Sequence, residues 1–150
     1  MANKKSTSRA SVRSVGGRLS AADRDKLVMT AQDVRGRAYA PYSKYHVGAA
    51  VLTASGRIFG GCNIENASYG LTLCAERAAV ASAIAAGHQT FIAIAIVTEN
   101  LSSLCGACRQ FLSEFNPAMA VILADAHGKR KVHNLRDLLP ESFGPNNLKE

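Results

Sequence analysis

Apolar residues recur along the chain with spacings that predict both helices and strands. The first pattern has the period of a helix, begins after Ser20, a residue type that favours helix N-termini, and ends where Pro41 prevents further helix. Its apolar members are Leu27, Val28, Ala31, Val34 and Ala38. We therefore expect one helix over residues 20–40, packed on a sheet through these side chains.

The strand patterns fall into two groups. Residues 47–53 and 57–63 flank the turn Ala54-Ser55-Gly56 and predict an antiparallel hairpin. Residues 91–97 and 118–124 are continuous apolar runs, which are typical of strands covered on both faces. A helix predicted over residues 106–115 separates these two runs, so we expect a parallel pair joined by a right-handed crossover.

Three further elements complete the expected fold. Residues 74–86 are rich in alanine, which predicts a buried central helix that stops at Gly87. A short strand is expected at 130–133, and a helical turn at 135–139. The fold class is therefore α/β: a three-layer α/β/α domain over residues 20–150, with a mixed five-stranded sheet.

Charge separates the N-terminal segment from this domain. The net charge is +7, but five basic residues precede the first acidic one, and from residue 19 onward thirteen basic residues face eleven acidic ones. Residues 1–19 also contain few large apolar side chains, so we expect a disordered basic tail. A solvated extension, a transit peptide and a weak phosphate contact are the alternatives for its role.

The same distribution limits the classes of partner. The domain is nearly neutral, so we expect no nucleic-acid partner. No run of about 18 apolar residues and no signal-peptide pattern is present, and we therefore expect a cytoplasmic protein with no membrane partner. At 47% hydrophobic residues, the chain has enough apolar material for a core.

Two short cysteine motifs carry the candidate chemistry. Cys105 and Cys108 have the two-residue spacer that lets neighbouring thiols bind one metal ion, and Cys74 would supply a third sulfur from another part of the fold. Three thiolates hold three corners of a tetrahedral Zn²⁺ ion and leave the fourth for water, as in catalytic zinc sites. Glu76 would lie beside that corner if Cys74 occupies the non-helical residue before its helix.

The charge of this set calls for compensation. Three thiolates and Zn²⁺ sum to −1, which disfavours ionisation of a bound water, and Arg77 is the nearest cation in sequence. With that compensation, Glu76 can take a proton from the water and pass it on. The motifs therefore predict hydrolytic attack on an electrophilic carbon.

Several motifs resemble those of the small homotetrameric zinc-dependent cytidine deaminases, and the match extends from about Leu27 to Phe143. They are Ala38-Tyr39-Ala40-Pro41-Tyr42-Ser43, Val47-Gly48-Ala49-Ala50, Gly61-Cys62-Asn63-Ile64-Glu65-Asn66-Ala67-Ser68-Tyr69, Cys74-Ala75-Glu76-Arg77 and Cys105-Gly106-Ala107-Cys108-Arg109-Gln110. The resemblance implies a cytidine deaminase-like fold, a homotetramer, one Zn²⁺ per subunit and a role in pyrimidine salvage. It also implies hydrolysis of cytidine and deoxycytidine to uridine and deoxyuridine, with Glu76 moving protons to N3 and to the departing ammonia.

The resemblance assigns further roles residue by residue. Cys74, Cys105 and Cys108 would hold zinc. Asn63 and Glu65 would bind the ribose hydroxyl, Tyr45 would lie against the nucleoside and Ala75 would contact the base through its backbone. Phe143 matches an aromatic that closes a neighbouring subunit's site in this family.

One inference about substrate size and two departures from the family pattern follow. A carboxylate at Glu65 accepts hydrogen bonds from sugar hydroxyls but repels a phosphate, which favours a free nucleoside. Leu104 replaces the proline that usually precedes the second zinc cysteine, so we expect a more mobile ligand loop. Tyr45 replaces the usual phenylalanine, and its hydroxyl needs a partner.

Other hypotheses fit parts of these motifs. If Cys62 were a fourth ligand, the zinc site would be closed and structural, and the protein would be a zinc-stabilised binding module. A thiol oxidoreductase would use Cys105 and Cys108 but would leave Cys74 and Glu76 unexplained. A blasticidin S-type deaminase shares the zinc motifs, although Asn63 and Glu65 favour the nucleoside enzyme. The four histidines lie outside the motifs and are expected on the surface or in turns.

Overall fold

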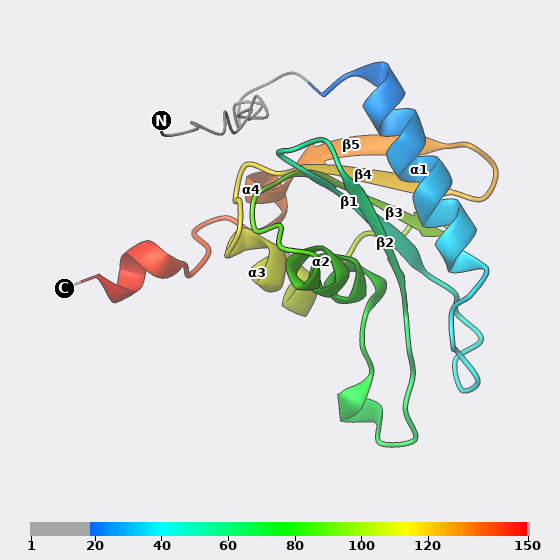
Figure 1. Ribbon diagram of the computed structural model, residues 1–150. Coiled ribbons are helices and arrows are strands. Elements are labelled where there is room, and N and C mark those ends of the chain that lie inside the picture. The colour runs from blue at the N-terminus through cyan, green and yellow to red at the C-terminus, as the bar shows by residue number, and fades with distance from the viewer. Residues whose placement is uncertain (1–18, 150) are drawn as a thin grey trace, which may run out of the picture.

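The computed structural model describes residues 19–149, which form one mixed five-stranded sheet between two layers of helices (Figure 1). The strands are β1 (Gly48–Thr53), β2 (Ile58–Cys62), β3 (Phe91–Thr98), β4 (Ala120–Asp125) and β5 (Arg130–Asn134), in the order β2-β1-β3-β4-β5. Only β3 and β4 pair in parallel, and the other neighbours are antiparallel. The expected three-layer α/β/α class is confirmed, whereas the expected tail over residues 1–19 lies almost entirely outside the described residues.

Two hydrophobic cores lie on opposite faces of the sheet. Helix α1 (Ala21–Arg35) covers one face, where Leu27 and Ala31 pack against Leu52 and Val97. Helices α2 (Ala75–Ala85) and α3 (Gly106–Ser113) cover the other, with the short helix α4 (Leu135–Leu138) beside α3. Because β3 and β4 have helices or strands on every side, their continuous apolar runs are buried.

Helix α1 ends earlier than the apolar spacing predicts. Its last residue is Arg35, and the prediction that it extends to Ala40–Pro41 was wrong. Beyond Gly36 the backbone pairs with another part of the chain instead, since Tyr39 N donates to Asn63 O and Glu65 N donates to Tyr39 O. Ala38 matches the helical spacing, but these tertiary hydrogen bonds decide the conformation of its segment.

The connection between β2 and α2 projects away from the sheet (Figure 1). Its base is held by a backbone pair between Ile64 and Leu73, and it contains a single 3₁₀ turn, η1 (Tyr69–Leu71). A second 3₁₀ turn, η2 (Pro145–Leu148), lies in the C-terminal segment, which extends from a different side of the body. Both segments carry large apolar side chains that are exposed: Tyr69, Leu71, Phe143 and Leu148.

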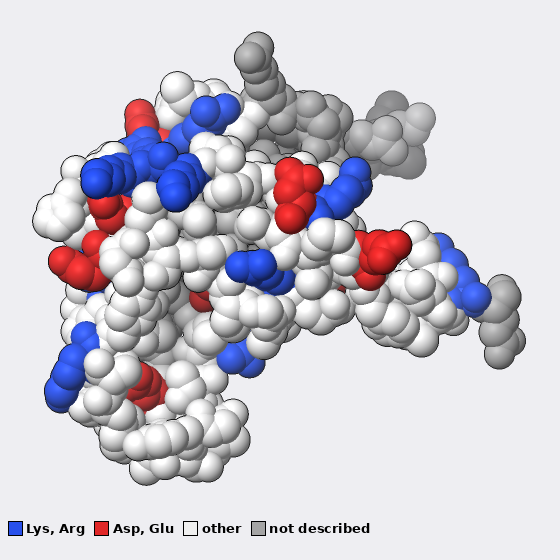
Figure 2. Space-filling model, turned by 180° about the vertical axis from the view of Figure 1, so that it is seen from behind, with Lys and Arg blue, Asp and Glu red and all other residues white. Residues whose placement is uncertain are grey.

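Acidic side chains accompany the basic ones on the surface. Figure 2 shows basic side chains gathered at one corner of the face opposite to that of Figure 1, with acidic side chains beside them. Ion pairs of this kind join Arg130 to Asp25 and Arg35 to Glu99. Within the described part of the chain, no helix is both long and apolar enough to cross a membrane.

Candidate active site

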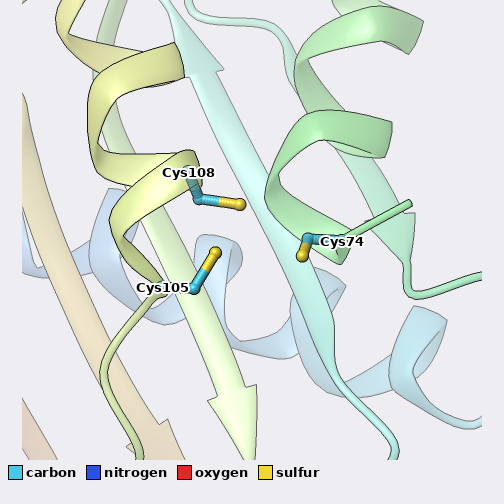
Figure 3. Close-up of side chains that lie close together, drawn as sticks. All are labelled: Cys74, Cys105 and Cys108. Carbon is cyan, nitrogen blue, oxygen red and sulfur yellow. The ribbon is translucent and has the colours of Figure 1, made fainter. Parts of the chain in front are cut away.

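The three motif cysteines meet where α2 and α3 begin. Cys74 is the N-cap of α2 and Cys105 is the N-cap of α3, both with extended backbone (φ −70°, ψ 151° and φ −69°, ψ 163°). Cys108 follows in the first turn of α3 and is fully buried. The sulfurs of all three point into the space between the two helix starts (Figure 3). Cys74 therefore occupies the non-helical position that a shared site with Glu76 requires.

The sulfur atoms are close enough to share one metal ion. The three Sγ atoms lie within 4.8 Å of one another. A tetrahedral zinc site with Zn–S bonds of about 2.3 Å holds its sulfurs about 3.8 Å apart, so a small inward movement would complete it. Thiolates are suitable ligands for a zinc dication. The unpaired N–H groups of the two helix starts also stabilise the negative charge of these thiolates. The donor set fits zinc.

Arg77 stabilises negative charge on this cluster. Its Nη2 lies 3.7 Å from Cys74 Sγ and donates a hydrogen bond to Thr72 O at 3.2 Å. A hydrogen bond from Cys108 and then the contact with Arg77 lower the pKa of Cys74 to about 5, against the opposing effect of burial. The pKa of Cys108 is raised, because its thiol keeps the proton of that bond and is buried. In the zinc-free protein Cys74 is thus the thiolate and Cys108 the thiol.

Glu76 is a buried carboxyl group in contact with this cluster. It lies in the first turn of α2 and only 4% of it is exposed. Burial raises the pKa of Glu76, and the charge of Cys74 raises it further. A carboxyl group with a raised pKa holds its proton more strongly than an exposed one, and it can exchange that proton with a bound molecule.

A cavity of about 280 Å³ opens beside the cluster. Cys74, Glu76 and Cys105 contribute to its wall, together with three residues that the resemblance assigned to the substrate, Asn63, Glu65 and Tyr45. The remaining lining residues are Ser43, Val47, Thr72, Ala75, Ile96, Thr98, Ser102 and Ser103. The size is close to the lower end of the range for small-molecule sites.

Asn63 and Glu65 each hold a neighbouring loop in place. Asn63 Oδ1 accepts a hydrogen bond from Val47 N at 2.9 Å, and its Nδ2 donates one to Tyr45 O at 2.8 Å. Glu65 accepts hydrogen bonds from Ser43 N, Ser43 Oγ and Tyr42 N. The hydrogen bond from the Ser43 hydroxyl is the main cause of the lowered pKa of Glu65, which is therefore a carboxylate at neutral pH.

The remaining assigned residues differ in their distance from the cavity. Ala75 and Tyr45 line it, and the Tyr45 hydroxyl finds a partner in Asn100, to whose Oδ1 it donates at 2.8 Å. Phe143 is 58% exposed and is not part of the wall. Its carbonyl oxygen accepts a hydrogen bond from Gln110 Nε2 at 2.9 Å.

The other candidates lie apart from the cluster. Cys62 is on β2, outside the three-sulfur group, so the closed four-cysteine site is not formed. Among residues 19–149 no histidine joins the group either. Arg109 does not line the cavity; its side chain binds Leu104 O and Ser103 Oγ in the loop before Cys105.

Two polar contributors to the site were not predicted from the sequence. Ser43 fixes Glu65, and it belongs to a quoted motif, so a polar residue following Pro41-Tyr42 was the available signal. Asn100 fixes the ring of Tyr45 from a loop that is 55 residues away in sequence, and no local pattern marks it.

Comparisons with known proteins agree with this geometry. Residues 21–124 match the family model described as the cytidine and deoxycytidylate deaminase zinc-binding region. A cytidine deaminase from Sporosarcina psychrophila is 44% identical over 129 residues, which cover 84% of this chain and 95% of that relative. The chain belongs to the cytidine deaminase family.

Further relatives and a solved structure support this membership. A Mycobacterium tuberculosis cytidine deaminase is 45% identical over 113 residues, covering 74% of this chain and 82% of the relative. The crystal structure of the Burkholderia pseudomallei cytidine deaminase superposes with a TM-score of 0.77 at 48% identity, covering 79% of this chain and 98% of that one. The protein is therefore an enzyme, a zinc-dependent aminohydrolase with the cytidine deaminase fold.

Proposed function

We propose that this enzyme hydrolyses cytidine and deoxycytidine to uridine and deoxyuridine with release of ammonia, as a cytoplasmic enzyme of pyrimidine salvage. The observation that carries the proposal is a single cavity whose wall holds the sulfur cluster, the buried carboxyl of Glu76 and the hydrogen-bonding groups of Asn63 and Glu65. The names of the relatives support the same activity.

The reacting end of the cavity would work through Glu76. Cys74, Cys105 and Cys108 would hold the zinc ion, which supplies, when bound, a water activated for attack at neutral pH. The raised pKa of Glu76 suits a group that takes one proton from the attacking water and delivers it to N3, and then takes the second proton of that water from the new C4 hydroxyl and delivers it to the leaving amine. Overall, water adds at C4, the C4–N bond breaks and ammonia leaves.

The sugar end would work through Asn63 and Glu65. Each side chain is oriented by hydrogen bonds to backbone groups. Each also has hydrogen-bonding positions that remain free to bind a ligand. Asn63 retains one N–H and one lone pair, and Glu65 Oε2 retains one lone pair beyond the bond from Ser43 Oγ. A ribose hydroxyl, which both donates and accepts, complements this set.

The charge of Glu65 favours a nucleoside over a nucleotide. Its lowered pKa keeps it ionised at neutral pH, and an ionised carboxylate repels a phosphate group placed near the sugar hydroxyls. Deoxycytidine monophosphate should therefore be a poor substrate, although the family description includes deoxycytidylate deaminases.

We infer that the active form is a homotetramer in which Phe143 closes the site of a neighbouring subunit. Support comes from the large apolar side chains that each projecting segment exposes, Tyr69 and Leu71 in one and Phe143 and Leu148 in the other, since contact with another subunit would bury them. The hydrogen bond from Gln110 to the Phe143 carbonyl would orient the C-terminal segment for this contact.

The test is a substrate panel with purified, zinc-loaded protein. Loss of cytidine and deoxycytidine is followed by ultraviolet absorbance, beside deoxycytidine monophosphate and blasticidin S. Turnover of both nucleosides, with little of the nucleotide or of blasticidin S, is expected. Absence of nucleoside turnover by protein that contains one zinc per subunit would overturn the proposal, and turnover of blasticidin S alone would favour the alternative deaminase.

A further inference from the structure

The side chain of Arg109 does not line the cavity but contacts the loop that leads to Cys105. Arg109 lies on α3 beyond Cys108 and folds back over the start of the helix. Its Nε donates to Leu104 O at 3.0 Å, its Nη2 to Ser103 Oγ at 3.2 Å and its Nη1 to Leu138 O at 2.8 Å. One guanidinium group therefore joins the loop before Cys105 to the end of α4.

These bonds restrain the backbone that enters Cys105. Leu104 O belongs to the peptide group that links Leu104 to Cys105, and because a peptide group is planar, fixing its oxygen also fixes the direction of the Cys105 N–H. The bond to Ser103 holds the residue on the other side of Leu104. A planar guanidinium with several fixed donors can grip both sides at once, whereas a lysine ammonium cannot reproduce that geometry.

Position 104 is where such a restraint matters. A proline there would fix φ covalently, but leucine leaves φ free to vary. The Leu104 side chain is 3% exposed and is anchored in the core, yet no hydrogen bond is found for its N–H among the described residues. The backbone immediately before Cys105 is therefore held by Arg109 and by packing of one side chain.

We propose that Arg109 is a positioning residue for the metal ligand Cys105, whose hydrogen bonds restrain a backbone segment that leucine at position 104 leaves without a covalent restraint. It keeps Cys105 Sγ within reach of Cys74 and Cys108, and the bond to Leu138 O makes α4 part of the support. The inference rests on the proposed zinc site, and it concerns the retention of zinc and not the chemistry of the substrate.

Zinc release tests this role independently of catalysis. Zinc-loaded wild-type and Arg109→Ala proteins are mixed with excess chromogenic chelator, and the rate of zinc transfer is measured. Loss of groups that orient a metal ligand typically costs about 10–100-fold in metal affinity, so we expect release to accelerate by a factor in that range. Arg109→Lys should fall between the two, and it carries the test if Arg109→Ala does not fold.

Two further variants separate positioning from a general loss of stability. Arg130→Ala removes an arginine contact of another kind, the ion pair from β5 to Asp25 on α1 and not to the 103–105 segment, so its zinc release should stay at the wild-type rate. Arg109→Ala combined with Leu104→Pro should regain slow release, because proline restores the backbone restraint.

The outcomes distinguish this inference from the proposed function. A wild-type protein that binds no zinc would refute the zinc site itself. Wild-type release rates in both Arg109 variants, or equal acceleration by Arg130→Ala, would overturn the positioning role while leaving the deaminase assignment intact. Fast release in the double variant would show that the restraint does not act through position 104.

Discussion

At the scale of single residues, the site depends on how a few charges are placed. Arg77 lies beside Cys74 because the two are three residues apart across a helix start, so the cation follows from the local sequence. The order in which the thiols ionise does not follow from the local sequence, because the lowered pKa of Cys74 depends mainly on a hydrogen bond from Cys108, which lies on another helix. The sequence thus predicted the compensating charge, and the fold decided which thiol loses its proton first.

Replacing Arg77 by glutamine should make Cys74 less acidic in zinc-free protein. The thiolate loses its cationic neighbour, so the pH midpoint for alkylation of Cys74 should rise from about 5 by roughly one pH unit. At pH values near the midpoint the variant therefore reacts more slowly than the wild type, because only the thiolate reacts. Alkylation by iodoacetamide as a function of pH, with peptide mass spectrometry to isolate Cys74, measures this. An unchanged or lowered midpoint would contradict the role of Arg77.

Replacing Glu76 by glutamine should abolish proton transfer while leaving the sulfur cluster intact. Glutamine is nearly isosteric but cannot take up a proton, so kcat for cytidine should fall by roughly 10²–10⁴-fold. Zinc content, measured by atomic emission, should remain at one per subunit because no ligand has changed. A variant that retains zinc and also retains near wild-type kcat would show that Glu76 is not the proton-transfer group.

At the scale of elements, α2 is positioned by close contact with β2. A methyl group at Gly61 would lie 2.3 Å from Ala79 N and 2.8 Å from Ala75 O, distances that the helix backbone cannot accommodate in place. Gly48 allows a similar approach of β1 to α1, where an added Cβ would lie 1.9 Å from Ala31 O. The glycines in these two strands therefore permit a close approach of helix and strand backbones.

Gly61→Ala should lower stability and loosen the start of α2. Overpacking against backbone atoms typically costs about 1–3 kcal/mol, and the displaced element carries Cys74 and Glu76. Urea denaturation measures the free energy of unfolding, and zinc content reports the site. Gly36→Ala is the matched control, since its Cβ would meet only Asp33 O at an ordinary 3.5 Å and its φ of −63° suits alanine. Equal stability of Gly61→Ala and wild type would contradict the close packing.

At the scale of the whole molecule, the two projecting segments are hard to explain in an isolated chain. Leu71 is 70% exposed and Leu148 is 74% exposed, while the sheet itself is well covered. Burial of such side chains between subunits would remove apolar surface from water, at about 25 cal/mol per Å². The proposed homotetramer is consistent with this exposure and would bring Phe143 to another subunit's cavity.

Leu71→Asp should therefore weaken assembly without unfolding the chain. A charge at this position is harmless in solvent but costly in an apolar interface, so the mass from light scattering should fall from four times the 15.9 kDa of one chain. Met29→Asp is the matched control, because Met29 is 68% exposed on α1, away from the projecting segments. A wild-type protein that is monomeric at micromolar concentration would contradict the tetramer.

Local sequence determined the elements and the identities of the reactive groups. Helical spacing of apolar residues marked α1, the turn at residues 54–56 marked β1 and β2, and continuous apolar runs marked β3 and β4, because a strand covered on both faces is apolar at every position. The spacing Cys105-Gly106-Ala107-Cys108 marked the chemistry because two metal ligands on one segment need a short, fixed separation, and Glu76 places a carboxyl group close to the third cysteine, Cys74.

Only the tertiary structure decided how these parts meet. Helix α1 stops at Arg35 because residues beyond it pair with the segment after β2, and Tyr45 is fixed by Asn100 across two loops. Arg109 turns away from the cavity to hold the entry to Cys105. Contacts of this kind join residues distant in sequence, and their free energy appears only when packing brings them together, so no local pattern records them.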